Sequence, residues 1–288
     1  MKKKKFSCKD IQQSIYCAPN EIRTCCQRFF VDGKLKGDVS LITVNKKRNV
    51  SYKELIEAKK SLVRGINNGT DKRCIGCPYL KLENWPEIEN EELGCVSIEN
   101  HSVCNMRCTY CSEVYYGGIK PQYDIDFLLS HIPGVSKDLH IAWGGGEPTI
   151  GKEFDRLFPL VNTKFNPTTQ RVFSNALKHS VALQEALDNK LTSITTSIDA
   201  GSEETFRKVR GAKRLDKVLS NLKLYSSTNP ELVTIKYIFT DDNFQINEFK
   251  KLHDKVKSIN KDKYYEINWD NIFLNEAKDN IEKNPIIY

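Results

Sequence analysis

Residues 104–111 read Cys104-Asn105-Met106-Arg107-Cys108-Thr109-Tyr110-Cys111. The cysteines follow a C-x3-C-x2-C spacing, so one continuous loop can present three thiolates around a single centre. Three thiolates are one short of a closed tetrahedral zinc site or a fully ligated iron–sulfur cube. If they hold a [4Fe–4S] cluster, one iron stays open to bind another molecule. This stretch therefore predicts a reactive metal centre.

The composition is that of an ordinary packed chain. It has 288 residues and a formal net charge of +7. No apolar run approaches the roughly 20 residues of a membrane span, and the lysine-rich start lacks the apolar stretch of a signal peptide. We therefore expect a cytoplasmic protein with no membrane contact. The lysines are dispersed and no aromatic and basic stripe accompanies them, which disfavours a nucleic-acid partner.

The cysteines are distributed unevenly. All 10 lie in the first 111 residues. Without an export signal a disulfide framework is not expected, whereas clustered cysteines are typical of metal sites. The pattern places metal chemistry in the N-terminal part and in the 104–111 loop.

Strand-like and helix-like runs alternate from residue 94 onward. This alternation indicates βα units with a parallel sheet, and six units predict a partial (β/α)6 barrel over residues 94–288. The functional site is expected at the carboxyl ends of the strands. The predicted strands are Cys95–Ile98, Leu139–Trp143, Thr169–Phe173, Leu191–Ile198, Leu232–Phe239 and Tyr264–Trp269. The predicted helices are Tyr123–His131, Lys152–Leu160, Ser180–Asn189, Ser202–Val209, Arg214–Ser226 and Asn247–Ile259.

Residues 1–93 form a predicted small module of a different kind. Phe29–Leu41, broken by glycines, predicts a hairpin. Ser51 with Glu54 forms a capping-box pattern that opens a helix ending near Asn67. Such a loop-rich unit has a thin core of its own, and a metal commonly stabilises units of this kind.

Five segments together resemble the radical S-adenosylmethionine (SAM) superfamily. The cysteine loop after a first strand, with Tyr110 before its last cysteine, resembles the superfamily signature. Gly144-Gly145-Gly146-Glu147-Pro148 resembles its Gly-Gly-Glu-Pro motif. The remaining matches are Ser197-Ile198-Asp199-Ala200-Gly201, Thr205–Gly211 and Ile235–Thr240.

The resemblance implies a catalytic [4Fe–4S] cluster on Cys104, Cys108 and Cys111, with SAM bound to its open iron. Gly145, Gly146 and Glu147 would approach the methionine amino group. Ser197 and Arg210 would hold its carboxylate or the ribose, and Tyr110 would lie beside the adenine. Reductive cleavage of SAM would then give a 5′-deoxyadenosyl radical that abstracts hydrogen from a substrate.

Simpler explanations exist for each motif. The three cysteines can belong to a zinc site, and the glycine run can be only a tight turn. Ser197 and Asp199 can be a helix cap, since strand-to-helix junctions favour such residues. Arg210 can be a surface charge near a helix end. No residue is assigned as a catalytic acid or base.

The upstream cysteines resemble a SPASM or twitch module, which holds an auxiliary [4Fe–4S] cluster in some radical SAM enzymes. Here the module precedes the barrel, whereas it commonly follows it. The ligands predicted for this second cluster are Cys17, Cys26, Cys74 and Cys77. Cys25 is the alternative to Cys26, because adjacent cysteines point in different directions. Cys95 is expected in the core and Cys8 in a mobile tail, and a zinc ribbon is the alternative for the module.

The expected function is a net oxidation or modification of a small molecule, such as a sugar or cyclitol, by a radical SAM oxidoreductase. One alternative is a radical SAM maturase of a ribosomally synthesised peptide. A second alternative, from another class, is a non-catalytic zinc- and nucleic-acid-binding protein. The implied partners are the small-molecule or peptide substrate and a reductant such as flavodoxin or ferredoxin.

Overall fold

The computed structural model describes residues 4–89, 92–111, 118–259 and the backbone of 266–272. The chain divides into two compact units. Unit 1 comprises residues 1–101, 119–145 and 164–169, and unit 2 comprises residues 102–118, 146–163 and 170–288. Within the described residues, no helix is both long and apolar enough to cross a membrane.

Unit 1 combines short N-terminal elements with the first two strands predicted for the barrel. Its strands are β1 (Lys5–Ser7), β2 (Ser14–Cys17), β3 (Glu21–Arg23), β4 (Arg28–Val31), β5 (Lys34–Gly37), β6 (Ser40–Thr43), β7 (Lys81–Glu83), β8 (Leu93–Ile98) and β9 (Val135–Trp143). Its helices are α1 (Lys9–Gln13), α2 (Tyr52–Asn68) and α4 (Ile125–Ser130).

The larger sheet of unit 1 has the strand order β9-β8-β2-β3-β6. β8 is parallel to both β9 and β2, whereas β3 is antiparallel to β2 and β6. The register pairs Ser14 with Cys95 and Cys17 with Ile98. Residues before the predicted boundary at 93 thus pair directly with the first predicted barrel strand. The division into a cysteine-rich part and a barrel part stays a prediction.

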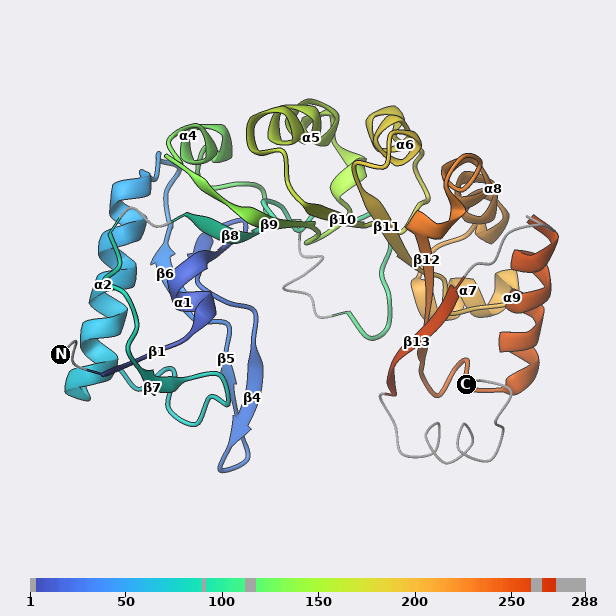
Figure 1. The fold of residues 1–288 in the computed structure, drawn as a ribbon. Helices are drawn as coiled ribbons and strands as arrows, with labels where there is room; N and C mark the ends of the chain where they lie inside the picture. The colour runs from blue at the N-terminus through green and yellow to red at the C-terminus, as the bar shows by residue number, and fades with distance from the viewer. Residues whose placement is uncertain (1–3, 90–91, 112–117, 260–265, 273–288) are drawn as a thin grey trace. The chain divides into compact units, whose positions relative to one another are not determined.

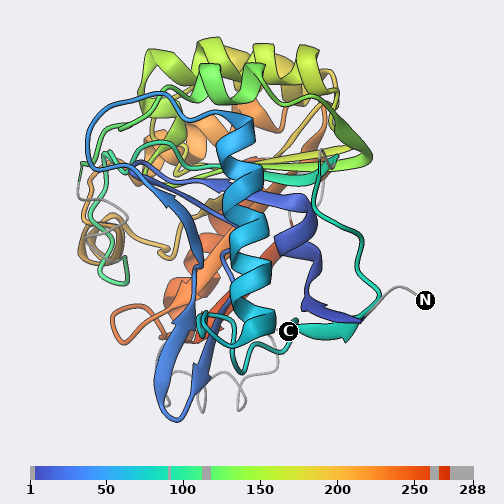
Figure 2. The ribbon, with the colours of Figure 1, turned by 90° about the vertical axis from the view of Figure 1, so that its left-hand side faces the viewer.

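The two local predictions for the N-terminal part are confirmed. β4 and β5 form an antiparallel hairpin that turns at Asp32 and Gly33, both in the left-handed region. The Ser51 hydroxyl caps α2 by accepting from Glu54 N at 3.2 Å, and Gly69 ends the helix with a φ of 79°. Figure 2 shows α2 running along unit 1.

Unit 2 contains the remaining βα repeats. Its strands are β10 (Thr169–Phe173), β11 (Ser193–Ser197), β12 (Val233–Phe239) and β13 (Glu266–Ile272). Its helices are η1 (Pro148–Ile150), α5 (Lys152–Phe165), α6 (Val181–Asp188), α7 (Glu203–Arg210), α8 (Leu215–Tyr225), η2 (Pro230–Leu232) and α9 (Ile246–Ile259). The strands lie in the order β13-β12-β11-β10, and the pairs β10–β11, β11–β12 and β12–β13 are parallel.

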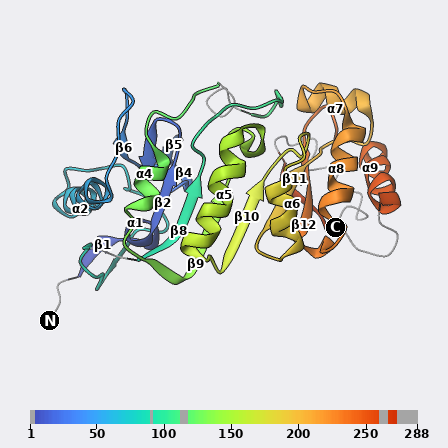
Figure 3. The ribbon, with the colours of Figure 1, turned by 90° about the horizontal axis from the view of Figure 1, so that it is seen from above.

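Helices cover one side of the unit 2 strands. α5, α6 and α8 lie along that side of β10, β11 and β12 (Figures 1 and 3). β12 is buried at every second residue, from Val233 to Phe239, as expected for a strand packed on a helix layer. Each of the six predicted strands overlaps an observed strand, and each predicted helix overlaps an observed helix. Residues 264 and 265 of the last predicted strand lie outside the described residues.

Candidate functional site

The cysteine loop is fixed by backbone contacts to the end of α7. Arg107 N donates to Arg210 O at 3.0 Å, and Thr109 N donates to Val209 O at 2.9 Å. A Cβ on Gly211 would lie 2.3 Å from Arg107 O, so only glycine permits this approach. Gly211 also has a φ of +63°, which favours glycine. The Arg-Gly pair that ends α7 therefore supports the loop that carries the thiols.

The three thiols of this loop share one electrostatic environment. Burial, together with the charges of the neighbouring Cys108 and Cys104, raises the pKa of Cys111 to about 11. Burial also raises the pKa of Cys104 and Cys108, whereas Arg210 lowers both. Thiols of this kind stay protonated at neutral pH until a metal supplies positive charge. The 104–111 loop is therefore suited to a metal group that is ligated by thiolates.

Within the described residues, no group of three or more His, Cys, Asp or Glu side chains is arranged to hold one metal ion. A [4Fe–4S] cluster makes a different demand, because each of its irons takes one thiolate and the ligands surround a cube. The loop, with its three half-buried thiols, is compatible with that larger group.

Asn175 joins the loop to the end of β10, a contact that sequence reasoning missed. Its Nδ2 donates to Asn105 Oδ1 at 2.6 Å and lies 3.8 Å from Cys104 Sγ. Ser174 and Asn175 directly follow a parallel strand, at the edge where sites form in such sheets. That polar pair after a strand was the available signal.

The Glu147 side chain ties the glycine-rich segment to the same strand end. Its Oε1 accepts from Thr149 N at 3.1 Å, Thr149 Oγ1 at 2.7 Å and Ser174 Oγ at 2.8 Å. Its Oε2 accepts from Asn175 N at 2.6 Å. Burial raises the pKa of Glu147, and these hydrogen bonds lower it. The carboxylate positions protein groups, and its predicted contact with the cofactor stays a prediction.

The two glycines before Glu147 are required by neighbouring backbone. A Cβ on Gly145 would lie 2.7 Å from His101 O, and Gly145 has a φ of +91°. A Cβ on Gly146 would lie 2.2 Å from Val103 O. Glu147 N also donates to Val103 O at 2.8 Å. A tight turn alone does not explain Gly146, because its constraint is the approach to the segment that leads into Cys104.

Gly146→Ala is expected to destabilise the protein by about 1–3 kcal/mol, because the added methyl overlaps a backbone carbonyl that has to shift. It should also lower the cluster content after reconstitution. Thermal and denaturant unfolding measure the first effect, and iron analysis measures the second. Gly151→Ala is the control, since its Cβ would lie 3.8 Å from the nearest atom, Glu153 N. Equal stability of the two variants would contradict the steric argument.

Asp199, just past the end of β11, hydrogen-bonds both Tyr110 and Arg210, two residues that were predicted to contact SAM. The Tyr110 hydroxyl donates to Asp199 Oδ2 at 2.6 Å, and Arg210 Nη1 donates to the same oxygen at 3.0 Å. Arg210 Nη1 also donates to the Tyr110 hydroxyl. Asp199 Oδ1 accepts from Ile238 N at 2.7 Å, which anchors the network on β12. Asp199 is fully buried and has a φ of 62°.

Both simpler explanations for this segment are wrong. The cap of α7 is Ser202, whose hydroxyl accepts from Thr205 N at 3.3 Å. Arg210 is 6 % exposed, so it is no surface charge. Within the part of the chain that the structure describes, its buried Nε has no hydrogen-bond acceptor. A bound ligand with an acceptor would satisfy that donor. Ser197 is half-buried at the end of β11, in the same segment.

The four upstream cysteines predicted as ligands lie in different surroundings. Cys17 is fully buried beside Tyr123. The exposed Cys26 donates to the Tyr16 hydroxyl at 3.1 Å. Cys74, in contrast, has Cys25, Cys8 and Cys77 as neighbours, and their charges raise the pKa of its thiol. Cys95 is half-buried, near Cys26 and Ser14. Of the adjacent pair, Cys25 and not Cys26 is among the thiols whose charges act on Cys74.

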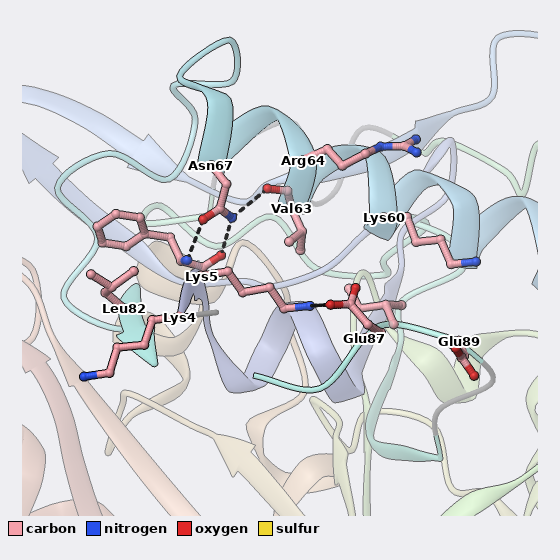
Figure 4. Close-up of a pocket in the computed structure, with 11 residues that line it drawn as sticks. Lys4, Lys5, Lys60, Val63, Arg64, Asn67, Leu82, Glu87 and Glu89 are labelled. Carbon is pink, nitrogen blue, oxygen red and sulfur yellow. Dashed lines mark hydrogen bonds and ion pairs between the residues drawn. The ribbon is translucent and has the colours of Figure 1, made fainter. Parts of the chain in front are cut away.

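Unit 1 contains a pocket of about 730 Å³ that no predicted site residue lines. Basic and apolar side chains from β1, α2 and β7 form it, together with acidic residues that precede β8 (Figure 4). Lys5 pairs with Glu87 at 2.8 Å, and the Asn67 amide bonds both backbone groups of Phe6. These contacts fix β1 against α2.

The fold and the cysteine loop define a class of protein, and the chain belongs to the radical SAM superfamily. Residues 101–255, more than half of the chain, match it. The GTP 3′,8-cyclase of Vibrio parahaemolyticus serotype O3:K6 is 23 % identical over 151 residues, which is 49 % of this chain and 44 % of that protein. The Pasteurella multocida GTP 3′,8-cyclase is 28 % identical over 130 residues, which is 42 % of this chain and 37 % of that protein. The chain thus aligns with less than half of the length of these relatives.

Solved structures show the same fold. The structure of hexahistidine-tagged anSMEcpe with bound AdoMet gives a TM-score of 0.51 at 20 % identity and covers 68 % of this chain and 59 % of that one. Native anSMEcpe with bound AdoMet and Cp18Cys peptide gives 0.50 at 19 %, with 66 % and 57 % covered. The predicted α/β fold class of the radical SAM type is confirmed.

Proposed function

We propose that this chain is a radical SAM enzyme whose Cys104, Cys108 and Cys111 bind a [4Fe–4S] cluster with one open iron. The observation that carries the proposal is the convergence of separate motifs in unit 2. The loop backbone bonds the end of α7, the Asn175 amide reaches Cys104, and Glu147 bonds the same strand end. When bound, the cluster and SAM supply a 5′-deoxyadenosyl radical that removes hydrogen from a substrate.

The residues of the chain would bind and orient SAM. The unsatisfied Arg210 Nε is a charged donor for a carboxylate or ribose oxygen. Asp199 holds that guanidinium and the Tyr110 hydroxyl in place. Gly145 and Gly146 let backbone segments approach closely, and Ser197 adds a hydroxyl at the end of β11. Asp199 and Arg210 are buried, which shields this ion pair from water.

The substrate we propose is a small molecule, and the curated relatives make a purine nucleotide triphosphate such as GTP the first to test. The comparisons give no support to a sugar or cyclitol. A peptide is the second candidate, because an enzyme of the same fold was solved with a peptide bound. A non-catalytic zinc or nucleic-acid protein is not supported by the superfamily match. An external reductant of the flavodoxin or ferredoxin kind would supply the electron.

The direct test is formation of 5′-deoxyadenosine by the full chain. After anaerobic reconstitution with iron and sulfide, the protein should produce it from SAM and dithionite. GTP should increase the rate if the nucleotide proposal holds, and the Cp18Cys peptide should increase it if the peptide alternative holds. A protein that binds iron but yields no 5′-deoxyadenosine under any of these conditions would refute the proposed function.

A further inference from the structure

Four cysteines of unit 1 lie in segments that the fold brings together. Cys8 caps α1, where its Sγ accepts from Ile11 N at 3.5 Å. Cys25 follows β3, and Cys74 and Cys77 share a tight turn in which Cys77 N donates to Cys74 O at 3.1 Å. Cys8, Cys25 and Cys74 are buried and Cys77 is half-buried. None of the four forms a disulfide.

Strand pairing places the first and last of these segments next to each other. β1 and β7 are antiparallel, and the register pairs Ser7 with Lys81. Cys8 directly follows Ser7, and Cys77 lies four residues before Lys81. The chain that enters Cys8 therefore runs beside the chain that leaves Cys77. Cys8 does not lie in a mobile tail, as its sequence position suggested, because this pairing fixes it.

Side-chain contacts hold the Cys25 segment on the same helix that Cys8 caps. The Thr24 hydroxyl donates to Asp10 O at 3.0 Å, and Thr24 N donates to Val39 O at 2.9 Å. Gln27 Nε2 reaches Asp10 Oδ2 at 3.4 Å. Cys25 lies in the sequence between Thr24 and Gln27, the two residues that contact Asp10.

The 74–77 turn contacts the β4–β5 hairpin. Gly76 has a φ of +83°, and a Cβ on it would meet Val31 Cγ2 at 2.4 Å. Lys36 Nζ donates to Ile75 O at 3.5 Å. Asp71 N donates to Gly65 O at 3.0 Å, which attaches the start of this loop to α2. The Ile75 side chain is exposed, whereas Cys74 is buried.

The electrostatics agree with this geometry. Burial and neighbouring charges together raise the pKa of Cys74 to about 12, and the thiols among these neighbours are Cys25, Cys8 and Cys77. Burial likewise raises the pKa of Cys8 to about 11, with Cys25 among the contributors. Neighbouring thiols of this kind, three of them buried and none in a disulfide, are characteristic of a metal site.

We propose that Cys8, Cys25, Cys74 and Cys77 are the four thiolate ligands of a second [4Fe–4S] cluster in this protein. Each thiolate binds its own iron, so the ligands do not need to meet at one ion. All four irons are then ligated by protein, and the cluster has no open position for SAM. Cys17, beside Tyr123, and Cys26, bonded to Tyr16, are not among the thiols that act on Cys74, so they are left out of this ligand set.

The test separates this cluster from the one on the 104–111 loop. In the full chain with Cys104→Ala, Cys108→Ala and Cys111→Ala, anaerobic reconstitution should leave about four irons and four sulfides per chain, against about eight of each in the unmodified chain. Adding Cys25→Ser should remove the remaining iron, whereas adding the adjacent Cys26→Ser should leave it. Loss of iron with Cys26→Ser and retention with Cys25→Ser would overturn the ligand set. About one tightly bound zinc and no sulfide would overturn the cluster.

Folding is checked in the chain that keeps its loop cysteines. There Cys25→Ser should retain about four irons, which reports an intact loop cluster and a folded protein. If Cys25→Ser does not fold, Cys77→Ser provides the same measurement, because its thiol is the least buried of the four. Retention of all the iron in Cys77→Ser would contradict the proposal. None of these iron counts depends on SAM cleavage, so the proposed function and this inference can fail separately.

Discussion

Cys108→Ala is expected to reduce 5′-deoxyadenosine formation to the background without enzyme and to remove about four irons per chain. The loop supplies three thiolates, and two cannot hold a cube whose fourth iron must stay open. This loss of activity should be larger than the loss of about 10–100-fold that follows mutation of a residue that only hydrogen-bonds a metal ligand. Iron and sulfide analysis, with chromatography of the reaction products, measures both effects.

Cys26→Ala is the matched control for this experiment. It removes a thiol that is exposed and bonded only to the Tyr16 hydroxyl among the contacts described. It should leave the iron content and 5′-deoxyadenosine formation unchanged. If Cys108→Ala retained the activity of the unmodified chain, the assignment of the catalytic loop would be wrong.

The fold could be predicted where the pattern is local. Alternation of apolar runs located every βα repeat, and the Ser51 and Glu54 spacing located the start of α2. Glycine positions were also informative, because a missing Cβ marks a close approach. The sequence alone showed only part of the reason why position 146 requires glycine. Its neighbour is the carbonyl of Val103, 43 residues earlier in the numbering.

The site was harder to predict where its contacts join distant segments. Asn175 reaches Cys104 across 71 positions, and Tyr110 reaches Asp199 across 89. The position of Asn175 after a strand indicates a place at the site edge, but no neighbouring residue indicates that its amide reaches a thiol. Motif resemblance found Arg210 and Tyr110, but only the structure shows that Asp199 connects them.

Contacts between distant segments also decide which N-terminal cysteines lie near one another, and the sequence does not show these contacts. The resemblance to a SPASM or twitch module led to the choice of Cys17 and Cys26. Their side chains are directed by strand pairing instead: β2 lies between β3 and β8, which buries Cys17 in the sheet. Cys8 was assigned to a tail because three-residue β1 gives almost no pattern, yet its pairing with β7 fixes it. Short strands that pair across 70 or more residues cannot be recognised from composition.

Asp199→Asn is expected to destabilise the protein by about 3–5 kcal/mol, because it leaves the buried Arg210 guanidinium without its countercharge. Burial raises the pKa of Asp199 well above that of an ordinary aspartate, with Ile238 N and Lys236 acting in the opposite direction. Arg210 at 3.0 Å favours the ionised carboxylate. Asparagine tolerates the positive φ of this position, so the substitution changes the charge and leaves backbone strain nearly unchanged.

Denaturant unfolding of the metal-free protein measures this loss, and equilibrium binding of SAM to the reconstituted protein measures the consequence for the site. SAM affinity should fall, because the Arg210 and Tyr110 side chains lose the shared acceptor that orients them. Asp216→Asn, at an exposed position in the first turn of α8, is the charge-matched control and should change stability by no more than about 0.5 kcal/mol. A stable Asp199→Asn variant with unchanged SAM affinity would show that the Asp199–Arg210 pair organises neither the fold nor the cofactor site. Normal stability with weakened SAM binding would instead assign the pair to the cofactor site alone.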